Sequence, residues 1–287
     1  MSSRNEKDAL TWPAPAKLNL FLRITGRQPD GYHDLQTLFQ ILDWGDVLKF
    51  STTRDGRISR SCNIDGIPEK DDICVKAATL LKSIAGVSEG VHIDLTKNIP
   101  TGAGLGGGSS DAATTLVALN KLWSCGLTAG QLAALGLELG ADVPVFVHGH
   151  SALAQGRGEL LQPVHLGERY YVLVFPGLSI STARVFQHAE LKRDSKPLSL
   201  NDSPLTTGRN DCLKVVMRLY PELNSIVKDL QSWGEPHMSG TGSTFFLQFD
   251  SKNAAINAAS NLKCRYNVRH VSGVDRSPLL ECLLAFR

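Results

Sequence analysis

A glycine-rich segment, "PTGAGLGGGSS" at residues 100–110, points most directly to chemistry. It holds five glycines within residues 102–108, and a run with helical spacing follows from Asp111. Backbone N–H groups without bulky side chains approach a phosphate closely, and a helix N-terminus adds unpaired donors and the positive end of a dipole. We therefore expect a phosphate-binding loop. The alternative is a flexible loop before a capped helix.

Two known phosphate-binding patterns can be compared with this segment. The Walker pattern fails because no Lys follows the glycines. Gly102, Gly104 and Gly107 satisfy G-x-G-x-x-G, but no acidic residue lies between Asp111 and Glu138 to bind the ribose of a dinucleotide. The sequence therefore favours a nucleoside triphosphate, and a nicotinamide dinucleotide stays as the weaker alternative.

Three segments together resemble the GHMP kinase family, which includes galactokinases and the homoserine, mevalonate and phosphomevalonate kinases. They are P-x-x-x-G-L-G-x-x-S-S at 100–110, "PAPAKLNLFLRITGRQPDGYHDLQTLFQ" at 13–40 and "MSGTGSTFF" at 238–246. The resemblance implies an α+β fold with two domains and the site in the cleft between them. Residues 1–160 would form a domain similar to ribosomal protein S5 domain 2, and residues 161–287 a ferredoxin-like domain.

The resemblance also implies a reaction. The segments at 17–20, 30–33 and 140–146 are similar to motifs of family members that act on a cytidyl-polyol substrate. ATP, the co-substrate with Mg²⁺, would pass its γ-phosphate to the 2-hydroxyl of a methylerythritol moiety, in the non-mevalonate route to isoprenoid precursors. The implied ATP-binding residues are Lys97, Pro100, Thr101, Gly102, Ala103, Gly104, Leu105, Gly106, Gly107, Gly108, Ser109 and Ser110.

Asp142 and Lys17 are the catalytic candidates. Phosphoryl transfer needs a group that orients and deprotonates the attacking hydroxyl, and the resemblance gives Asp142 this role, although Gly-Ala-Asp also suits a turn. The resemblance puts Lys17 beside it, where a cation favours a charged carboxylate and lowers the pKa of the acceptor hydroxyl. The alternative for Lys17 is a solvated position on an edge strand.

Four further residues are expected at the acceptor substrate. Asn19 shares a strand face with Lys17 and would bind the polyol or make a structural hydrogen bond. The resemblance assigns Tyr32 and His33 to the cytosine base, by ring stacking and hydrogen bonding, whereas alone they would be surface residues. Thr182 matches a position near the acceptor, but it also suits a helix cap.

Residues around the loop have two interpretations each. Lys97 would reach the nucleotide or be solvated. Ser109 and Ser110 would cap the helix, or one would offer its hydroxyl to a phosphate-bound Mg²⁺. Asp111 is favourable in a first helical turn without any function. The glycines within 238–243 would let the backbone pack closely against the phosphate loop.

Two rival functions stay open. A GHMP kinase for another alcohol, such as mevalonate or homoserine, would bind no cytidine, so Tyr32 and His33 would have no role in substrate binding. A non-catalytic nucleotide sensor would be expected to lack Asp142 or Lys17, and both are present.

Alternation and helical periodicity predict the elements that must position these residues. We expect strands at 18–24, 35–42, 46–50, 91–97, 170–176, 268–272 and 278–286, a polar strand and turn near 56–66, and a glycine loop feeding a strand at 237–249. We expect helices at 73–84, 111–123, 128–139 and 253–263, and over 210–231 with a break at Pro221. The polar stretch near 156–168 is the expected domain boundary.

Composition sets bounds on partners and location. The net charge of +2, with Lys and Arg spread along the chain, argues against a nucleic-acid partner. The six cysteines form no C-x-x-C pair and have no His at metal spacing, so we expect reduced thiols, a cytoplasmic location and no protein-bound metal centre. The first ten residues lack an apolar segment, so no signal peptide is expected, and no apolar run reaches the roughly 20 residues of a membrane span. Nothing indicates the oligomeric state.

Overall fold

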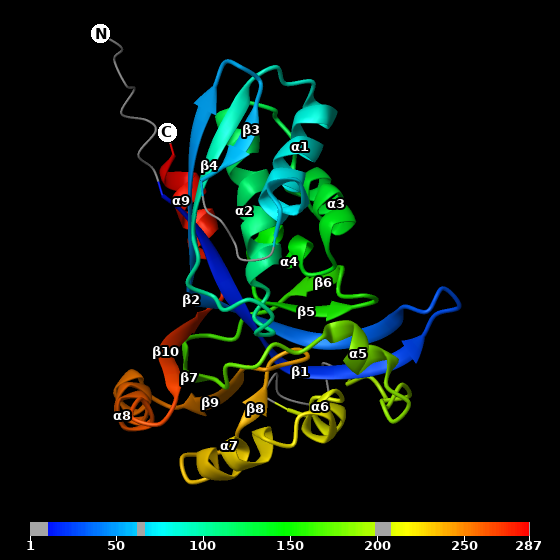
Figure 1. The fold of residues 1–287 in the computed structure, drawn as a ribbon, viewed down its shortest axis with the longest axis vertical. Helices are drawn as coiled ribbons and strands as arrows, with labels where there is room; N and C mark the ends of the chain where they lie inside the picture. The colour runs from blue at the N-terminus through cyan, green and yellow to red at the C-terminus, as the bar shows by residue number, and fades with distance from the viewer. Residues whose placement is uncertain (1–10, 62–66, 199–207, 287) are drawn as a thin grey trace.

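One mixed β-sheet runs through the molecule (Figure 1). The computed structural model describes residues 11–61, 67–198 and 208–286, and within them ten strands join in one sheet with the main order β3-β4-β2-β10-β7-β9-β8. β1 and β5 also pair with β2, and β6 pairs with β5. The strands are β1 (Trp12–Arg27), β2 (His33–Thr53), β3 (Ile58–Arg60), β4 (Gly90–Thr96), β5 (Ala152–Gln155), β6 (Leu160–Pro163), β7 (Arg169–Phe175), β8 (His237–Met238), β9 (Phe245–Phe249) and β10 (Asn267–Val274).

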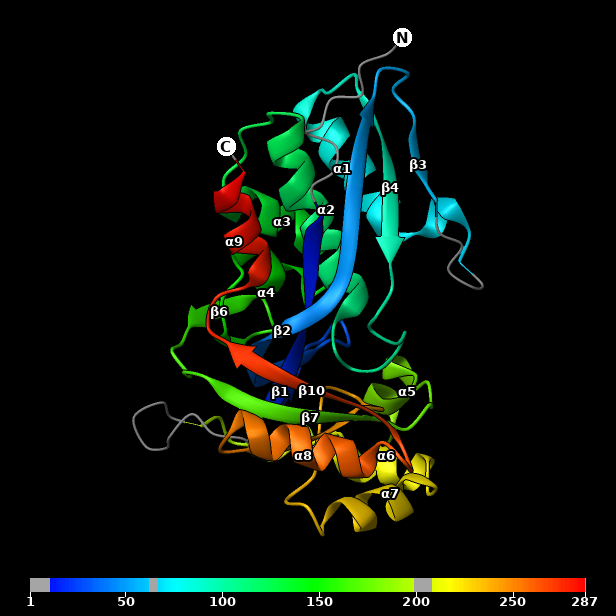
Figure 2. The ribbon, with the colours of Figure 1, turned by 90° about the vertical axis from the view of Figure 1, so that its left-hand side faces the viewer.

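Helices lie in two groups at opposite ends of the molecule (Figure 1). The first group follows a short 3₁₀ turn, η2 (Glu69–Asp71), and comprises α1 (Ile73–Ala85), α2 (Gly107–Leu122), α3 (Ala129–Leu139), α4 (Val143–His148) and the C-terminal α9 (Pro278–Ala285). The second group comprises α5 (Thr182–Gln187), α6 (Leu213–Leu219), α7 (Leu223–Leu230) and α8 (Lys252–Leu262). Figure 2 shows α8 lying along β7 and β10.

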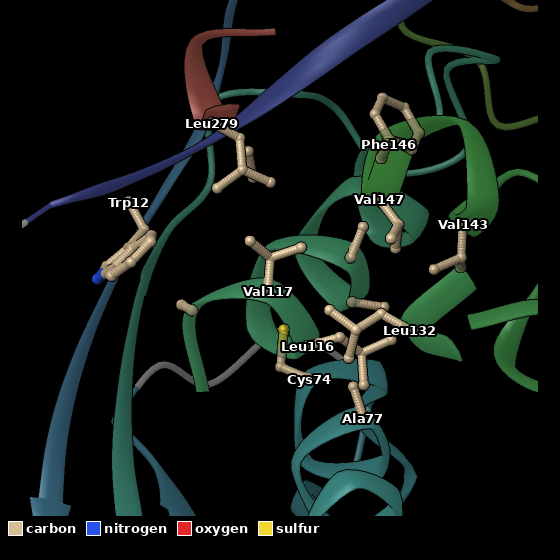
Figure 3. Packing of buried hydrophobic residues seen from close by; sticks show 14 of the residues in the cluster. Trp12, Cys74, Ala77, Leu116, Val117, Leu132, Val143, Phe146, Val147 and Leu279 are labelled. Carbon is tan, nitrogen blue, oxygen red and sulfur yellow. The ribbon is translucent and has the colours of Figure 1, made fainter. Parts of the chain in front are cut away.

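Each helix group covers its own apolar core. The first core, in part shown in Figure 3, includes Trp12 of β1, Phe146 of α4 and Leu279 of α9. The second core includes Phe245 of β9 together with residues of α6, α7 and α8. A third cluster contains residues of β1, β2, β7 and β9 and also Leu105 of the glycine-rich segment. That segment is therefore anchored in the packed interior through its leucine.

The pair formed by β1 and β2 carries residues into the site. The two strands are antiparallel, but their register shifts between Pro15 and Lys17 and again between Asn19 and Leu22. Such bulges bend a strand and re-aim its side chains, and they are common beside active sites. Lys17 and Asn19 therefore lie where the strand is locally irregular.

Three expectations about the elements were wrong. Residues 278–286 form helix α9 instead of a strand, because Pro278 is at its first position and the Ser277 side chain caps it by accepting from Leu279 N at 3.1 Å. The two strands expected at 35–42 and 46–50 are one strand, β2. Helix α2 begins at Gly107, four residues before the expected Asp111.

Other elements lie close to their expected bounds, including α1, α3, α8, β3, β4 and β7, and Pro221 separates α6 from α7. The expected domain division at residues 160 and 161 stays a prediction. β10 pairs with both β2 and β7, and α9 packs near Trp12, so the C-terminal residues return to the first core. Residues 1–10 and Cys62 lie outside the described residues, within which the other cysteines are free thiols.

Candidate active site

A cleft with a volume of 1090 Å³ is lined by residues of the first 160 positions and by residues of α5 and the glycine segment near residue 240. Its walls come from the start of α1, the glycine-rich segment, β1, α5 and the turn before His33. Nearly all of the expected site residues line this cleft. They are Lys17, Asn19, Tyr32, His33, Lys97, Pro100, Thr101, Gly102, Ala103, Gly104, Leu105, Gly106, Gly107, Gly108, Ser109, Asp142 and Thr182. Ser110 is absent from the lining and is fully buried.

The glycine loop depends on glycine at three left-handed positions. Gly102, Gly104 and Gly106 have φ angles of 69°, 77° and 72°, which L side chains rarely adopt. A Cβ on Gly104 would lie 2.3 Å from the carbonyl oxygen of Ser239 and 2.8 Å from that of Gly242. The expectation that the glycine segment near residue 240 packs closely against the loop is therefore confirmed.

The N-terminus of α2 is open toward the cleft. Gly106 is its N-cap, and none of the described side chains caps the helix. The expectation that Ser109 or Ser110 caps it was wrong, because the helix has already begun at Gly107. The N–H groups of Gly107, Gly108 and Ser109 have no acceptor among the described residues, as is usual for a first helical turn without a cap. These donors and the helix dipole make the position suitable for an anion.

Lys17 is buried at the meeting point of three elements. It is 3% exposed, and its Nζ contacts Asn19 Oδ1 at 2.5 Å, the carbonyl oxygen of Gly104 at 3.2 Å and Asp142 Oδ2 at 3.3 Å. The ammonium group has three donors, so it links β1, the glycine loop and the start of α4. The alternative of a solvated Lys at this position was wrong.

Asp142 presents an accessible carboxylate, ion-paired with Lys17, to the cleft. It is the N-cap of α4, yet its side chain makes no capping hydrogen bond to the described helix N–H groups. Its side chain is 34% exposed, whereas that of Lys17 is 4% exposed. A carboxylate that is held by one buried cation and is otherwise accessible can accept a proton from a bound hydroxyl.

Asn19 uses its side-chain amide within the protein. Its Oδ1 accepts from Lys17, and its Nδ2 donates to Thr37 Oγ1 at 2.8 Å. These bonds fix the orientation of the amide, and Asn19 is 4% exposed. The structural hydrogen bond that we considered for Asn19 is therefore present, and Asn19 helps to hold the ammonium of Lys17.

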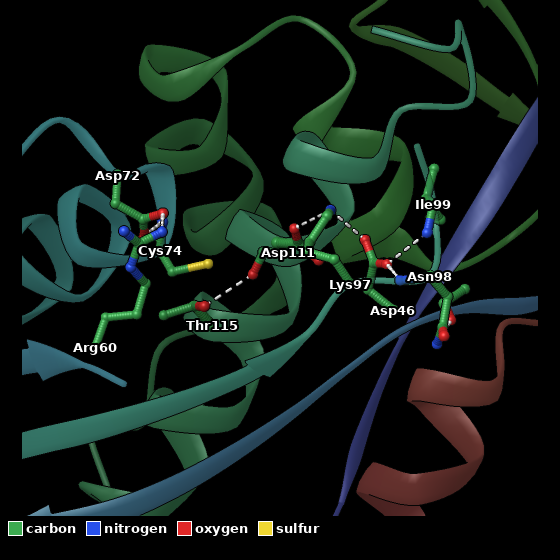
Figure 4. Close-up of polar contacts among 10 residues, drawn as sticks. Asp46, Arg60, Asp72, Cys74, Lys97, Asn98, Ile99, Asp111 and Thr115 are labelled. Atoms are coloured by element: carbon green, nitrogen blue, oxygen red, sulfur yellow. Dashed lines mark hydrogen bonds and ion pairs between the residues drawn. The ribbon is translucent and has the colours of Figure 1, made fainter. Parts of the chain in front are cut away.

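Lys97 bridges two buried carboxylates behind the glycine loop (Figure 4). Its Nζ contacts Asp46 Oδ2, and it donates to Asp111 Oδ2 at 2.8 Å. Asp46 Oδ1 also accepts from the backbone N–H groups of Asn98 at 2.5 Å and Ile99 at 2.8 Å. Lys97 is therefore not a freely solvated residue, and this cluster ties the chain before the loop to the helix after it.

Asp111 was expected in the first turn of a helix, and this expectation was wrong. It lies beyond the first turn of α2, and its side chain is 3% exposed. Burial raises the pKa of Asp111 to about 8, because the neighbouring Asp46 adds to the effect and Lys97 opposes it only in part. Burial also lowers the pKa of Lys97, but the two carboxylates outweigh that effect and raise it overall. One cation shared by two buried acids is consistent with a proton held on Asp111 near neutral pH.

Aromatic rings gather at the far end of the cleft. The ring of His33 lies 5.1 Å from that of Phe186, measured between centroids. Burial, Arg193 and Arg27 lower the pKa of His33, while Asp34 opposes them. Tyr32 is 59% exposed, and the guanidinium carbon of Arg157 lies 4.1 Å from its ring centroid.

Thr182 is the first residue of α5, and the cap of that helix is Ser181. The Thr182 hydroxyl lies 2.9 Å from the Thr241 hydroxyl, so the cap that we considered for Thr182 was wrong. This bond joins α5 to the glycine segment near residue 240.

Sequence reasoning missed three residues of this site. Phe186 follows Thr182 at i+4, which places both on one face of α5, and this spacing could have identified it. Arg157 and Asp46 carry no sequence signal of their own, because their partners lie far away along the chain.

The comparisons with known proteins agree with this geometry. The model for the GHMP kinases N terminal domain matches residues 72–150, and the model for GHMP kinases C terminal matches residues 198–268. A 4-diphosphocytidyl-2-C-methyl-D-erythritol kinase from Nitrosococcus oceani is 48% identical over 274 residues, covering 96% of this chain and 98% of that protein. The chain belongs to the 4-diphosphocytidyl-2-C-methyl-D-erythritol kinase family of GHMP kinases.

Other members of the 4-diphosphocytidyl-2-C-methyl-D-erythritol kinase family give the same result. The protein of this name from Hahella chejuensis is 45% identical and covers 99% of both chains. A crystal structure of 4-(cytidine 5'-diphospho)-2C-methyl-D-erythritol kinase has a TM-score of 0.82 and 34% identity, over 92% of this chain and all of that one. A homoserine kinase from Cytophaga hutchinsonii, at 16% identity and a TM-score of 0.67, shares the fold.

The chain is therefore a small-molecule kinase with the two-domain α+β fold of the GHMP kinases. The described residues include no helix that is both long and apolar enough to cross a membrane.

Proposed function

We propose that this kinase transfers the γ-phosphate of ATP to the 2-hydroxyl of 4-diphosphocytidyl-2-C-methyl-D-erythritol, giving the 2-phosphate. The contact of 3.3 Å between Lys17 Nζ and Asp142 Oδ2, beside the open N-terminus of α2, carries the proposal. The names of the relatives support the substrate. This step belongs to the non-mevalonate route to isoprenoid precursors.

Asp142 is the proposed base. The acceptor hydroxyl gives its proton to the Asp142 carboxylate as its oxygen bonds to the γ-phosphorus, and the bond from that phosphorus to the bridging oxygen of ADP breaks. Lys17 holds Asp142 and opposes the negative charge that develops on the hydroxyl oxygen. The hydrogen bonds from Lys17 to Asn19 and Gly104 keep the ammonium in place during this step.

The glycine loop is the proposed phosphate site. The N–H groups of Gly107, Gly108 and Ser109 would donate to the triphosphate, and the cleft continues past them toward Ile73, which leaves room for the nucleoside. Lys97 would act mainly by fixing the loop through Asp46.

Mg²⁺ is the expected metal of this reaction. Within the described residues no group of three or more His, Cys, Asp or Glu side chains could hold a metal ion. The oxygen donors that line the cleft are nevertheless suitable, because Mg²⁺ takes one or two protein oxygens together with phosphates. Ser109 would supply such an oxygen, while Asp142 stays available as the base. Bound there, Mg²⁺ would neutralise charge on the β- and γ-phosphates.

Tyr32, His33 and Thr182 are proposed to bind the acceptor. Tyr32 and His33 would contact the cytosine base, and Thr182 would lie near the polyol. A cytoplasmic location and the absence of a nucleic-acid partner stay predictions.

A direct assay tests the function. Purified protein with ATP and Mg²⁺ should phosphorylate the cytidyl-polyol, and ³¹P NMR should place the new phosphate on the 2-hydroxyl. The same assay with methylerythritol phosphate, mevalonate and homoserine should give little product. Equal turnover of mevalonate or homoserine would instead favour another GHMP kinase activity, and ATP binding without any turnover would favour a nucleotide sensor.

A further inference from the structure

Arg193 joins the parts of the cleft that are proposed to bind the base. Its Nε donates to His33 Nε2 at 3.0 Å. Its Nη2 donates to the carbonyl oxygens of Phe186 and His188, each at 2.9 Å, and its Nη1 donates to that of Leu191 at 3.1 Å. One guanidinium group therefore binds the imidazole and the backbone at the end of α5.

The bond to His33 determines where the imidazole carries its hydrogen. A guanidinium group only donates hydrogen bonds and stays charged in proteins. His33 Nε2 must therefore accept, and the hydrogen of a neutral ring is on Nδ1. His33 lines the cleft, and Nδ1 has no hydrogen-bond partner among the residues that the structure describes.

We propose that Arg193 is a positioning residue, which holds His33 as a neutral ring with its hydrogen on Nδ1 so that the ring donates to an acceptor atom of the pyrimidine. This inference rests on the proposed function only in naming the base. Cytosine carries two acceptors on one edge, the O2 carbonyl oxygen and the unprotonated N3. A ring with Nδ1 fixed as a donor matches either atom.

The same residue also fixes the ring beside His33. The carbonyl of Phe186 accepts from Arg193, and the Phe186 ring contacts the His33 ring. Loss of Arg193 would therefore remove one hydrogen bond from the His33 ring and one from the backbone that carries the Phe186 ring.

The charges around His33 favour the neutral form. The groups that act on it are Arg193 from the loop after α5, Arg27 at the end of β1 and Asp34 on β2. A protonated ring would direct an Nε2–H group at the guanidinium of Arg193, which cannot accept it. Burial and the two arginines lower the pKa of His33, and Asp34 only partly offsets them.

NMR of ¹⁵N-histidine-labelled protein without substrate tests the inference, with His33→Gln used to assign the signals. In the wild type at about pH 8, above the ordinary pKa of histidine, we expect His33 to show a protonated Nδ1 and an unprotonated Nε2. In Arg193→Gln the ring should lose this fixed tautomer and its pKa should rise. Arg265→Gln, which removes an exposed arginine outside the cleft, should leave the signals unchanged. A wild-type ring with its hydrogen on Nε2 would overturn the proposal, even if the variant failed to fold.

Kinetics give the second readout. Loss of a hydrogen bond to a charged group predicts a KM for the cytidyl-polyol about tenfold higher in Arg193→Gln, with the KM for ATP changed less than about twofold. Arg193→Lys should recover only part of the loss, because an ammonium group cannot reproduce the planar fork. An unchanged KM for the cytidyl-polyol in Arg193→Gln would contradict the inference. A wild type that does not phosphorylate this substrate would refute the proposed function, while the NMR result would still decide the role of Arg193.

Discussion

Helices α1 and α2 both begin at the wall of the cleft, but their first turns are completed in opposite ways. At α1, the Asp72 carboxylate accepts from the N–H groups of Cys74 at 2.9 Å and Val75 at 3.1 Å, and it also binds Arg60 at 2.7 Å. At α2, the N-cap is Gly106, and the described residues provide no side-chain cap.

The difference shows that the unpaired N–H groups at a helix N-terminus can serve either stability or ligand binding. Every α-helix leaves its first N–H groups without an intrahelical partner. Where the chain supplies its own anion, as at α1, those donors contribute to stability. Where it supplies glycine, as at α2, the donors stay accessible and a ligand can provide the anion.

Asp142→Asn should have the largest effect, because it removes the proposed base while the open end of α2 is left intact. We expect turnover to fall by about 100-fold to 10,000-fold, with ATP affinity nearly unchanged. Steady-state kinetics and calorimetric ATP titration measure the two quantities. Asp94→Asn, on β4 outside the cleft, is the control. Turnover close to that of the wild type would show that Asp142 is not the base.

Asp72→Ala tests whether the closed end of α1 is structural. The substitution removes the cap and leaves Arg60, whose side chain is 2% exposed, without its carboxylate. We expect the free energy of unfolding to fall by about 3 kcal/mol, measured by denaturant titration. The neighbouring Asp71→Ala, which removes an exposed carboxylate, should cost about 0.5 kcal/mol or less. Equal losses for the two variants would remove the distinction between the two helix ends.

Gly108→Val tests whether the open end of α2 binds phosphate. A Cβ on Gly108 would contact only the Ile73 side chain, at 4.0 Å, so the fold should tolerate the substitution. We expect ATP affinity to fall about tenfold or more, because a branched side chain blocks approach to the backbone donors. Gly106 is a poorer probe, since a Cβ there would lie 2.9 Å from the Phe146 ring.

Gly130→Val is the matched control for Gly108→Val. Gly130 is also the second residue of a helix, α3, and a Cβ there would meet no atom within 4 Å. This variant should bind ATP as the wild type does. Equal ATP affinity in the two variants would count against a phosphate at the start of α2.

Asp111→Asn probes the buried cluster behind the open helix end, and its expected effect is a change in how stability depends on pH. The pKa of Asp111 is raised from 3.8 to about 8 in the folded protein, so the native state holds more protons than the unfolded state in this window. The contribution of Asp111 to the free energy of unfolding is fully present below about pH 4, and it is lost as the pH rises toward 8.

The variant should remove that dependence. Relative to wild type, Asp111→Asn should become more stable as the pH rises from 4 to 8, by at most about 1.4 kcal/mol per pH unit. Denaturant titrations at several pH values measure this, with Asp94→Asn as the control. Parallel stability curves for Asp111→Asn and the wild type would mean that Asp111 is charged throughout.

Local signals explain what the sequence predicted well. The glycine pattern identified the loop, and the motif around Lys17 and the segment with Asp142 identified two parts that the structure brings within 3.3 Å. The start of α2 was predicted too late, because Gly107 and Gly108 are poor helix formers in isolation. The end of the chain was predicted as a strand, because a short apolar run suits either structure and the cap at Ser277 was overlooked.

Contacts between distant residues could not be predicted in the same way. Asp46 binds backbone more than 50 positions away, and Arg193 binds His33 across 160 positions. Neither residue lies in a pattern that indicates its partner. Only the folded sheet and loops bring these groups together, so their roles depend on the structure.

The central claim is that the open N-terminus of α2 holds a triphosphate whose last phosphate faces Asp142 and Lys17. The most direct test is a crystal structure with a non-hydrolysable ATP analogue, Mg²⁺ and the cytidyl-polyol. We predict phosphate oxygens within hydrogen-bond distance of the N–H groups of Gly107 and Gly108, and the acceptor hydroxyl between Asp142 and the γ-phosphorus. A triphosphate bound away from the start of α2, or a γ-phosphorus remote from both side chains, would contradict the account.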